Sequence, residues 1–218
     1  MATFDSVAAF QSLLQRKALV GAVLVADYAT AALTDICTSG GTLDALTGYS
    51  SLGKLTSDGL TLSNSQEKQE SRGWGDTASP SRNDITSASS SMAFSAMESN
   101  APVIDAFWGV DQTAVTASAT TGSVVFDLPP LPVLRNKRVL GLFRDTNQSN
   151  GLDIYLGVHY PRANISQNGD QTLVNNDLTY PMTAQALVDD VEGTPVRLMW
   201  GGPGLAGVLA DMGYTVAA

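Results

Sequence analysis

The feature that most constrains the fold is a series of short β-prone segments in the second half of the chain, each bounded by a turn signal. Turns are marked by Pro129-Pro130, Asn150-Gly151 and Glu192-Gly193, since Gly, Pro and Asn supply the backbone angles that chain reversals need. Many short strands at intervals of about 8–15 residues are typical of a β-sandwich or barrel. We therefore predict a mainly β fold with strands at 122–128, 137–144, 152–158, 160–167, 178–188 and 195–200.

The first half of the chain adds two short helices to this β framework. Residues 4–15 have apolar side chains near the helical period and predict an amphipathic N-terminal helix. Residues 100–109 predict a flanking helix that Asn100 caps and Gly109 ends. Strands are expected at 21–29 and 85–98, together with a hairpin over 48–62 whose turn is Ser57-Asp58-Gly59.

Two segments depart from the strand pattern. Residues 64–84 are polar and contain Gly73, Gly75 and Pro80, so we expect a long polar loop, and a loop of that length usually has a function. Residues 201–218 are rich in glycine and are expected to form an irregular C-terminal tail. The remaining chain, 1–200, is predicted to be a single β domain that includes the polar loop.

The charge and the reactive residues disfavour most enzyme chemistries. The 218-residue chain has 12 basic and 21 acidic residues, a net charge of −9, and clustered cations are what nucleic-acid binding requires. A single Cys excludes an internal disulfide, and a single His leaves little room for a catalytic triad. The most apolar stretch, 18–33, is too short and interrupted to span a membrane. We therefore expect no enzyme activity, no cofactor and no metal.

Two local patterns have a functional and a simpler interpretation. Residues 145–151 place oxygen-bearing side chains as a calcium loop does, but Leu156 stands where the bidentate Glu belongs, so a hairpin turn at Asn150-Gly151 is favoured. His159 lies between apolar and aromatic residues, and a surface or interface histidine is the expected interpretation.

Several segments in order resemble the major tail tube proteins of long-tailed, siphovirus-type bacteriophages. The resemblance rests on the 48–62 hairpin, the acidic stretch that leads through Arg72-Gly-Trp74-Gly to Asp76, the Ser/Thr-rich 84–98 strand, and the 100–109 helix that ends in Phe-Trp-Gly. Residues 178–184 and 193–200 complete it, so it covers roughly residues 20–200. The resemblance rests on the order of these segments, because none of them is a catalytic signature.

The resemblance implies a structural virion protein. It implies a β-sandwich subunit with a flanking helix, assembled into hexameric rings that stack into the tail tube, the conduit for genome delivery. The implied partners are other copies of the chain, a tape measure protein, and tail tip and terminator proteins. DNA would pass through the lumen without specific binding. The implied location is the phage tail, after assembly in the host cytoplasm.

Candidate site residues follow from charge and position. A ring larger than a dimer needs two different complementary patches on each subunit, and a basic run and an acidic cluster are the best pair available. Within the polar segment, an aromatic residue and two cations are further interface candidates. The interface candidates are Trp74, Arg72, Arg82, Arg135, Lys137, Arg138, Asp189, Asp190 and Glu192; the lumen-facing candidates, on the polar faces of two strands, are Asp58, Glu67, Glu70, Asp84 and Glu98.

A β-sandwich that binds glycans, as an adhesin-like module does, is the alternative interpretation. In that case exposed tryptophans such as Trp74, Trp108 or Trp200 would serve as stacking platforms for sugars. Assembly into rings or tubes distinguishes the structural role from this alternative. A monomer with glycan affinity favours the binding module.

Overall fold

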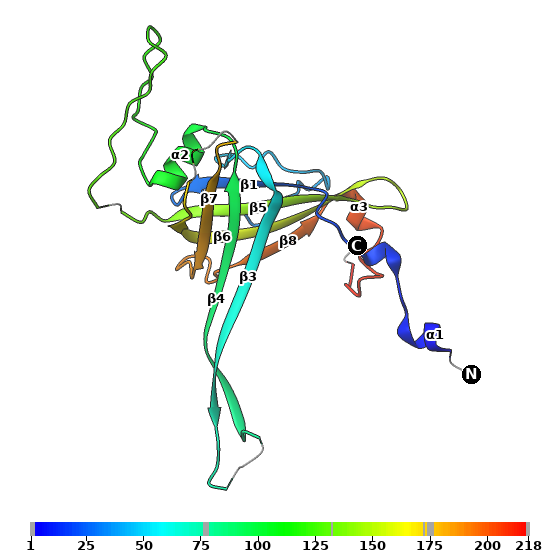
Figure 1. The fold of residues 1–218 in the computed structure, drawn as a ribbon. Helices are drawn as coiled ribbons and strands as arrows, with labels where there is room; N and C mark the ends of the chain where they lie inside the picture. Colours follow the sequence, from blue (N-terminus) through cyan, green and yellow to red (C-terminus); the bar gives the residue numbers. More distant parts are fainter. Residues whose placement is uncertain (1–2, 76–78, 132, 172, 174–176, 217–218) are drawn as a thin grey trace.

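The computed structural model describes residues 3–75, 79–131, 133–171, 173 and 177–216. These residues form one eight-stranded antiparallel sheet, with a short helix beside it and shorter ones towards each end of the chain (Figure 1). The predicted mainly β fold is confirmed. The strands are β1 (Val20–Asp27), β2 (Ser50–Ser51), β3 (Leu55–Ser71), β4 (Arg82–Ala96), β5 (Lys137–Thr146), β6 (Asp153–Asn168), β7 (Tyr180–Leu187) and β8 (Arg197–Gly201); the helices are α1 (Phe4–Ala8), the 3-10 turn η1 (Ser12–Leu14), α2 (Ala101–Trp108) and α3 (Pro203–Ala206).

Strand β6 joins two halves of the sheet. Its first half pairs with β5 on one edge and with β8 on the other, where His159 lies opposite Arg197. After the buried Pro161, the edge of β6 that had paired with β8 pairs with β7 instead. The full strand order is β2-β1-β5-β6-β7-β4-β3, with β8 beside β6. The sheet thus folds over itself, and the two layers share one core.

The core lies between these layers. The Cα of Gly141 in β5 faces the side chains of Met92 and Leu60 from the opposite layer so closely that a Cβ would touch them. Along β4 the buried residues alternate with more exposed ones, which is the period of two that a half-buried strand requires. The main cluster is Val23, Val25, Leu52, Met92, Phe94, Ala96, Val103, Ala106, Phe107, Val139, Val158, Tyr160, Ala163, Tyr180, Met182 and Ala184.

Helix α2 forms where the sequence predicted it. The Asn100 side chain accepts a hydrogen bond from the Val103 backbone N–H at 3.0 Å, which satisfies one of the free donors of the first turn. Gly109 ends the helix in the left-handed conformation, with φ +67°. The helix buries Val103 and Phe107 against the sheet, and the Phe107 ring packs edge-on against Tyr180.

The polar segment at 64–84 differs from the expected loop. β3 runs on to Ser71 and β4 already begins at Arg82, so most of this segment is a paired hairpin. The expected turn at 57–59 is also wrong, because it is an irregularity inside β3, where the pairing with β4 shifts between Leu55 and Leu60. Residues 57–59 are of the types that favour turns, but a β-bulge accommodates them without ending the strand.

Four other predicted elements differ from the structure. The N-terminal helix expected over residues 4–15 ends at Ala8, and only the 3-10 turn at Ser12–Leu14 follows it. No strand forms at 122–128, where the backbone has no partner strand. The two strands expected at 152–158 and 160–167 are one continuous strand, β6. The expected irregular tail at 201–218 contains the last residue of β8 and helix α3, and it buries Leu205 and Val208 against Ile154.

Candidate assembly surfaces

The outer part of the β3–β4 hairpin, residues 63–71 and 82–89, projects away from the body of the subunit and is called the distal hairpin (Figure 1). Its backbone ladder runs from Ser63 opposite Ser91 to Ser71 opposite Arg82. Every side chain of the distal hairpin is exposed on both faces. Trp74, in the connection at its tip, is fully exposed. A two-stranded ribbon without a packed face is marginally stable by itself. We therefore expect contact with another chain to stabilise the distal hairpin.

Charged residues of the distal hairpin pair with one another. Arg72 Nη2 lies 3.1 Å from Glu70 Oε2, and Arg82 Nε lies 2.8 Å from Asp84 Oδ2. The sequence predicted the arginines at an interface and the acids in a lumen, but the structure places each arginine beside an acid. Glu67 has no ion pair within the described part of the chain. Exposed pairs contribute only about 0.2–1 kcal/mol each, so they neutralise charge more than they stabilise the hairpin.

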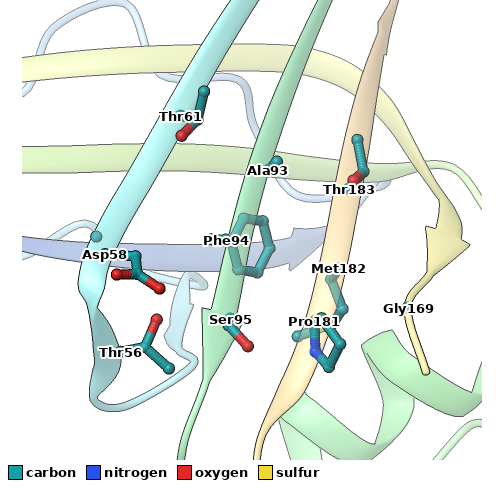
Figure 2. A pocket seen from close by; sticks show the side chains of 11 residues that line it. Thr56, Asp58, Thr61, Ala93, Phe94, Ser95, Gly169, Pro181, Met182 and Thr183 are labelled. Carbon is teal, nitrogen blue, oxygen red and sulfur yellow. The ribbon is translucent and has the colours of Figure 1, made fainter. Parts of the chain in front are cut away.

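The outer face of β3, β4 and β7 carries small and hydroxyl-bearing side chains over a broad groove of about 760 Å³. Figure 2 shows Thr61, Ser95 and Thr183 on three adjacent strands along this groove, with Asp58 at one end. No Lys or Arg is among the described residues that line it. In the proximal part of β4 the buried Met92, Phe94 and Ala96 alternate with partly exposed Ser and Ala residues. The described lining of the groove therefore offers no cation to a phosphate backbone.

The two remaining lumen candidates of the body occupy different environments. Asp58 is exposed in the irregular part of β3, at the groove. The Glu98 carboxylate instead accepts a hydrogen bond from the Lys54 backbone N–H at 2.8 Å. It occupies the space that a Cβ on Gly53 would need, and Gly53 has a φ of +79°. Glu98 therefore holds the turn between β2 and β3, in addition to carrying charge.

The basic run and the acidic cluster meet inside the subunit. Arg138 Nη1 lies 3.3 Å from Asp189 Oδ2, and both side chains are buried. Arg138 also donates to the carbonyls of Thr30 and Pro161, at 2.5 and 2.7 Å. Burial raises the pKa of Asp189, but hydrogen bonds from the Glu192 and Val191 backbone N–H groups outweigh it and leave the pKa below its usual value. The pair thus fixes the turn before β8 against β5.

The other charges of the two runs are also paired within the subunit. Arg135 and Lys137 both contact Asp105 of α2, at 3.5 and 2.7 Å. The acidic cluster meets arginines of β6 and β8. The sequence missed these partners because they lie far apart along the chain and come together only when the strands pair. The further pairs are Arg135–Asp111, Lys137–Asp27, Arg162–Asp190 and Arg197–Glu192.

His159 is fully buried, so its prediction as a surface or interface residue is wrong. It lies in the part of β6 that has a strand on both sides, which its local sequence does not reveal. The Tyr49 hydroxyl is 3.0 Å from its Nε2, and Nδ1 has no hydrogen-bond partner among the residues that the structure describes. Burial lowers the pKa of His159 to about 4, helped by Arg138 and Arg197. The histidine is therefore a neutral core residue at physiological pH.

Two apolar arms are candidate assembly surfaces that sequence reasoning did not identify. Residues 3–19 leave the body on one side, and residues 110–131 and 133–136 leave it on the opposite side (Figure 1). Both carry large apolar side chains in solvent, such as Phe10 and Leu131. The sequence predicted a helix over residues 4–15 and a strand over residues 122–128, and gave neither a role in assembly. An exposed apolar patch of this kind marks an interaction site.

The comparison with known families is consistent with these surfaces. A model of the phage tail tube protein family matches residues 8–198. The chain belongs to this family. A tail tube protein is a structural component of the virion tail and is not an enzyme. No curated protein matches the chain significantly. In this tail tube protein, no described helix is long and apolar enough to cross a membrane.

Proposed function

We propose that copies of this tail tube protein join side by side into hexameric rings, which stack into a tube that carries the phage genome into the host. The observation that carries the proposal is the long β3–β4 hairpin. Within the described chain β3 pairs only with β4, so its other edge is unpaired over most of 17 residues. An exposed edge of that length is a template for pairing with another chain. The hexameric number and the stacking come from the family resemblance.

The outer face of β3, β4 and β7 is the proposed lining of the lumen. A channel that releases a polyanion quickly should not attract it, because each phosphate that a Lys or Arg neutralises adds affinity. The described lining of the groove contains Asp58 and no cation. On the same hairpin Glu67 and the adjacent Lys68 both lack an ion pair within the described chain, while Arg72 and Arg82 are neutralised by their neighbours, so the hairpin adds no net positive charge to the acidic groove. The net charge of −9 per subunit has the same sign.

Other tail components are proposed partners on the basis of the family alone. A tape measure protein would occupy the lumen during assembly, and tip and terminator proteins would bind the two ends of the tube. Assembly would take place in the host cytoplasm.

Electron microscopy of the purified protein tests the assembly. We expect rings or tubes with a central channel, either spontaneously or after addition of a tail tip complex. A protein that remains monomeric under both conditions contradicts the proposal.

A charge reversal tests the lumen. Phage with Glu67→Lys should eject DNA more slowly than phage with Asp211→Lys, a matched reversal of an exposed acid near the C-terminus. Equal ejection rates for both phages, with intact tails, would overturn the proposed repulsive wall.

A further inference from the structure

The two apolar arms lie on opposite sides of the subunit, so neither covers the other. The N-terminal arm, residues 3–19, and the proline arm, residues 123–134, leave the body in opposite directions (Figure 1). A pair of unlike patches on opposite sides is what a head-to-tail ring contact uses. Such a contact also requires that the side chains of the two arms are chemically complementary.

The N-terminal arm presents an aromatic pair and two cations. Phe4 and Phe10 are 77% and 79% exposed, and their ring centroids lie 6.2 Å apart. Val7, between them in sequence, is 73% exposed. Arg16 and Lys17 follow, and neither forms an ion pair within the described part of the chain. Lys17 is exposed, whereas Arg16 is partly buried and donates to the Leu13 carbonyl at 2.6 Å. The arm is therefore an apolar aromatic surface with a basic end.

The proline arm has the complementary chemistry. It contains the sequence Leu-Pro-Pro-Leu-Pro over residues 128–132, and its described residues form no helix or strand. Val125 and Leu131 are 78% and 81% exposed. Asp127 is the only charged residue of the arm and has no ion pair in the described chain. The backbone bends at Pro130 and Leu131, and the fixed φ of each proline restricts the segment before it binds, which lowers the entropy cost of binding.

We propose that the N-terminal arm of one subunit binds the proline arm of its neighbour in the ring. Aromatic surfaces are the usual receptors of proline-rich segments, because the rings pack flat against the pyrrolidines. Phe4 and Phe10 supply these rings, and Arg16 and Lys17 approach Asp127 of the neighbour. Since each aromatic side chain can bury about 150–250 Å², two of them form a substantial part of a subunit contact. The inference rests on the proposed ring and names the segments that close it.

Cross-linking tests the contact directly. In a Cys37→Ala background we introduce Val7→Cys and Leu131→Cys in the same chain, and treat assembled protein with a short thiol-reactive cross-linker. The expected product is a ladder of covalent oligomers. The matched control, Val7→Cys with Val191→Cys, pairs the N-terminal arm with an exposed residue of the turn before β8 and should give no ladder.

The outcomes separate the inference from the proposed function. If tubes form but no covalent oligomers appear, or if both variants give the same oligomers, the contact between the arms is wrong. The proposed tube is not contradicted by this outcome. A parent protein that never forms rings or tubes overturns the proposed function, and the contact with it.

Charge reversal with rescue gives an independent readout. Asp127→Lys should raise the protein concentration needed for assembly by about two- to fivefold, as the loss of an exposed ion pair predicts, and Arg16→Glu with Lys17→Glu should restore it. The melting temperature of the free subunit should not change in either variant. Absence of any effect of Asp127→Lys, or of rescue, counts against the contact.

Discussion

The two ends of the β3–β4 hairpin have the same antiparallel backbone pairing, but they differ in the burial of their side chains. Near the body, β4 alternates buried Met92, Phe94 and Ala96 with small residues, and the core holds it. In the distal hairpin the same ladder continues, but no side chain is buried. Hydrogen bonds alone contribute little net stability, because water competes for the same groups. The proximal part is therefore held by the core of the subunit, whereas the distal part has no packed face within the described chain, and we propose that it contacts a neighbouring subunit.

The largest expected effect is a core truncation in the proximal part. Phe94→Ala removes a buried ring between the two layers and should lower the free energy of unfolding by about 3–5 kcal/mol. Ile85→Ala, its counterpart on the exposed distal part of β4, should change it by less than about 0.5 kcal/mol. Denaturant unfolding of the free subunit measures both values. Similar losses for the two variants would remove the distinction.

The pH dependence of the free energy of unfolding should also come from the body of the subunit, where His159 is buried. His159 has a pKa of about 4 in the folded subunit, against about 6.5 when unfolded, so the unfolded chain binds more protons between these values. The stability that this residue contributes is complete above about pH 6.5 and is lost as the pH falls, and the loss reaches about 3 kcal/mol by pH 4.

Unfolding at several pH values checks this linkage. His159→Gln, which does not titrate, should show a smaller loss of stability between pH 6.5 and pH 4 than the parent, even if it is less stable at pH 7. Parallel curves for the two proteins would show that the histidine is not the source.

The distal hairpin should respond in assembly and not in folding. Trp74→Ala removes the fully exposed ring at the tip, so the free energy of unfolding should stay within about 0.5 kcal/mol of the parent. If the ring is an anchor of a subunit contact, the concentration needed for tube assembly should rise by at least about tenfold. Sedimentation of assembled tubes measures this effect, with Tyr214→Ala as an exposed aromatic control.

Limited trypsin digestion gives a second view of the same segment. We expect cleavage between Lys68 and Arg82 in the free subunit and protection in the tube, because an unpartnered ribbon opens locally more often than a packed one. Equal protection in both states would mean that the distal hairpin needs no neighbour.

The smallest effect is expected for the exposed ion pairs. Asp84→Asn breaks the contact with Arg82 and should change the free energy of unfolding by about 0.2–1 kcal/mol at most. Asp189→Asn, which leaves Arg138 without its buried partner, should cost several times more. Thermal unfolding at low and at 0.5 M salt distinguishes the two, since salt screens only the exposed pair.

Local signals in the sequence predicted some elements closely. The cap at Asn100 and the left-handed Gly109 located α2 to within a residue, because capping depends on side chains next to the helix ends. The alternation in β4 also appeared in the sequence as a period of two. These elements need no knowledge of distant partners.

Elements without such signals were missed. The distal hairpin lacks an apolar face, so its strands resembled a loop, and only pairing with each other makes them strands. Residues 122–128 have the opposite problem, since they are β-branched and apolar but find no neighbouring strand. Secondary structure at these places depends on which chain segment lies beside them.

The sequence by itself determined the composition of the surfaces, namely a net negative charge, a Ser/Thr-rich strand face and an apolar helix face, and the turns at Asn150-Gly151 and Glu192-Gly193. Only the tertiary structure decided which groups meet. The cations of β5 find acids from β1, from α2 and from the turn that follows β7, His159 lies between two strands, and the two apolar arms remain uncovered. The physical reason is that propensity and capping act over a few residues, whereas charge pairing and burial depend on contacts between strands far apart in the chain.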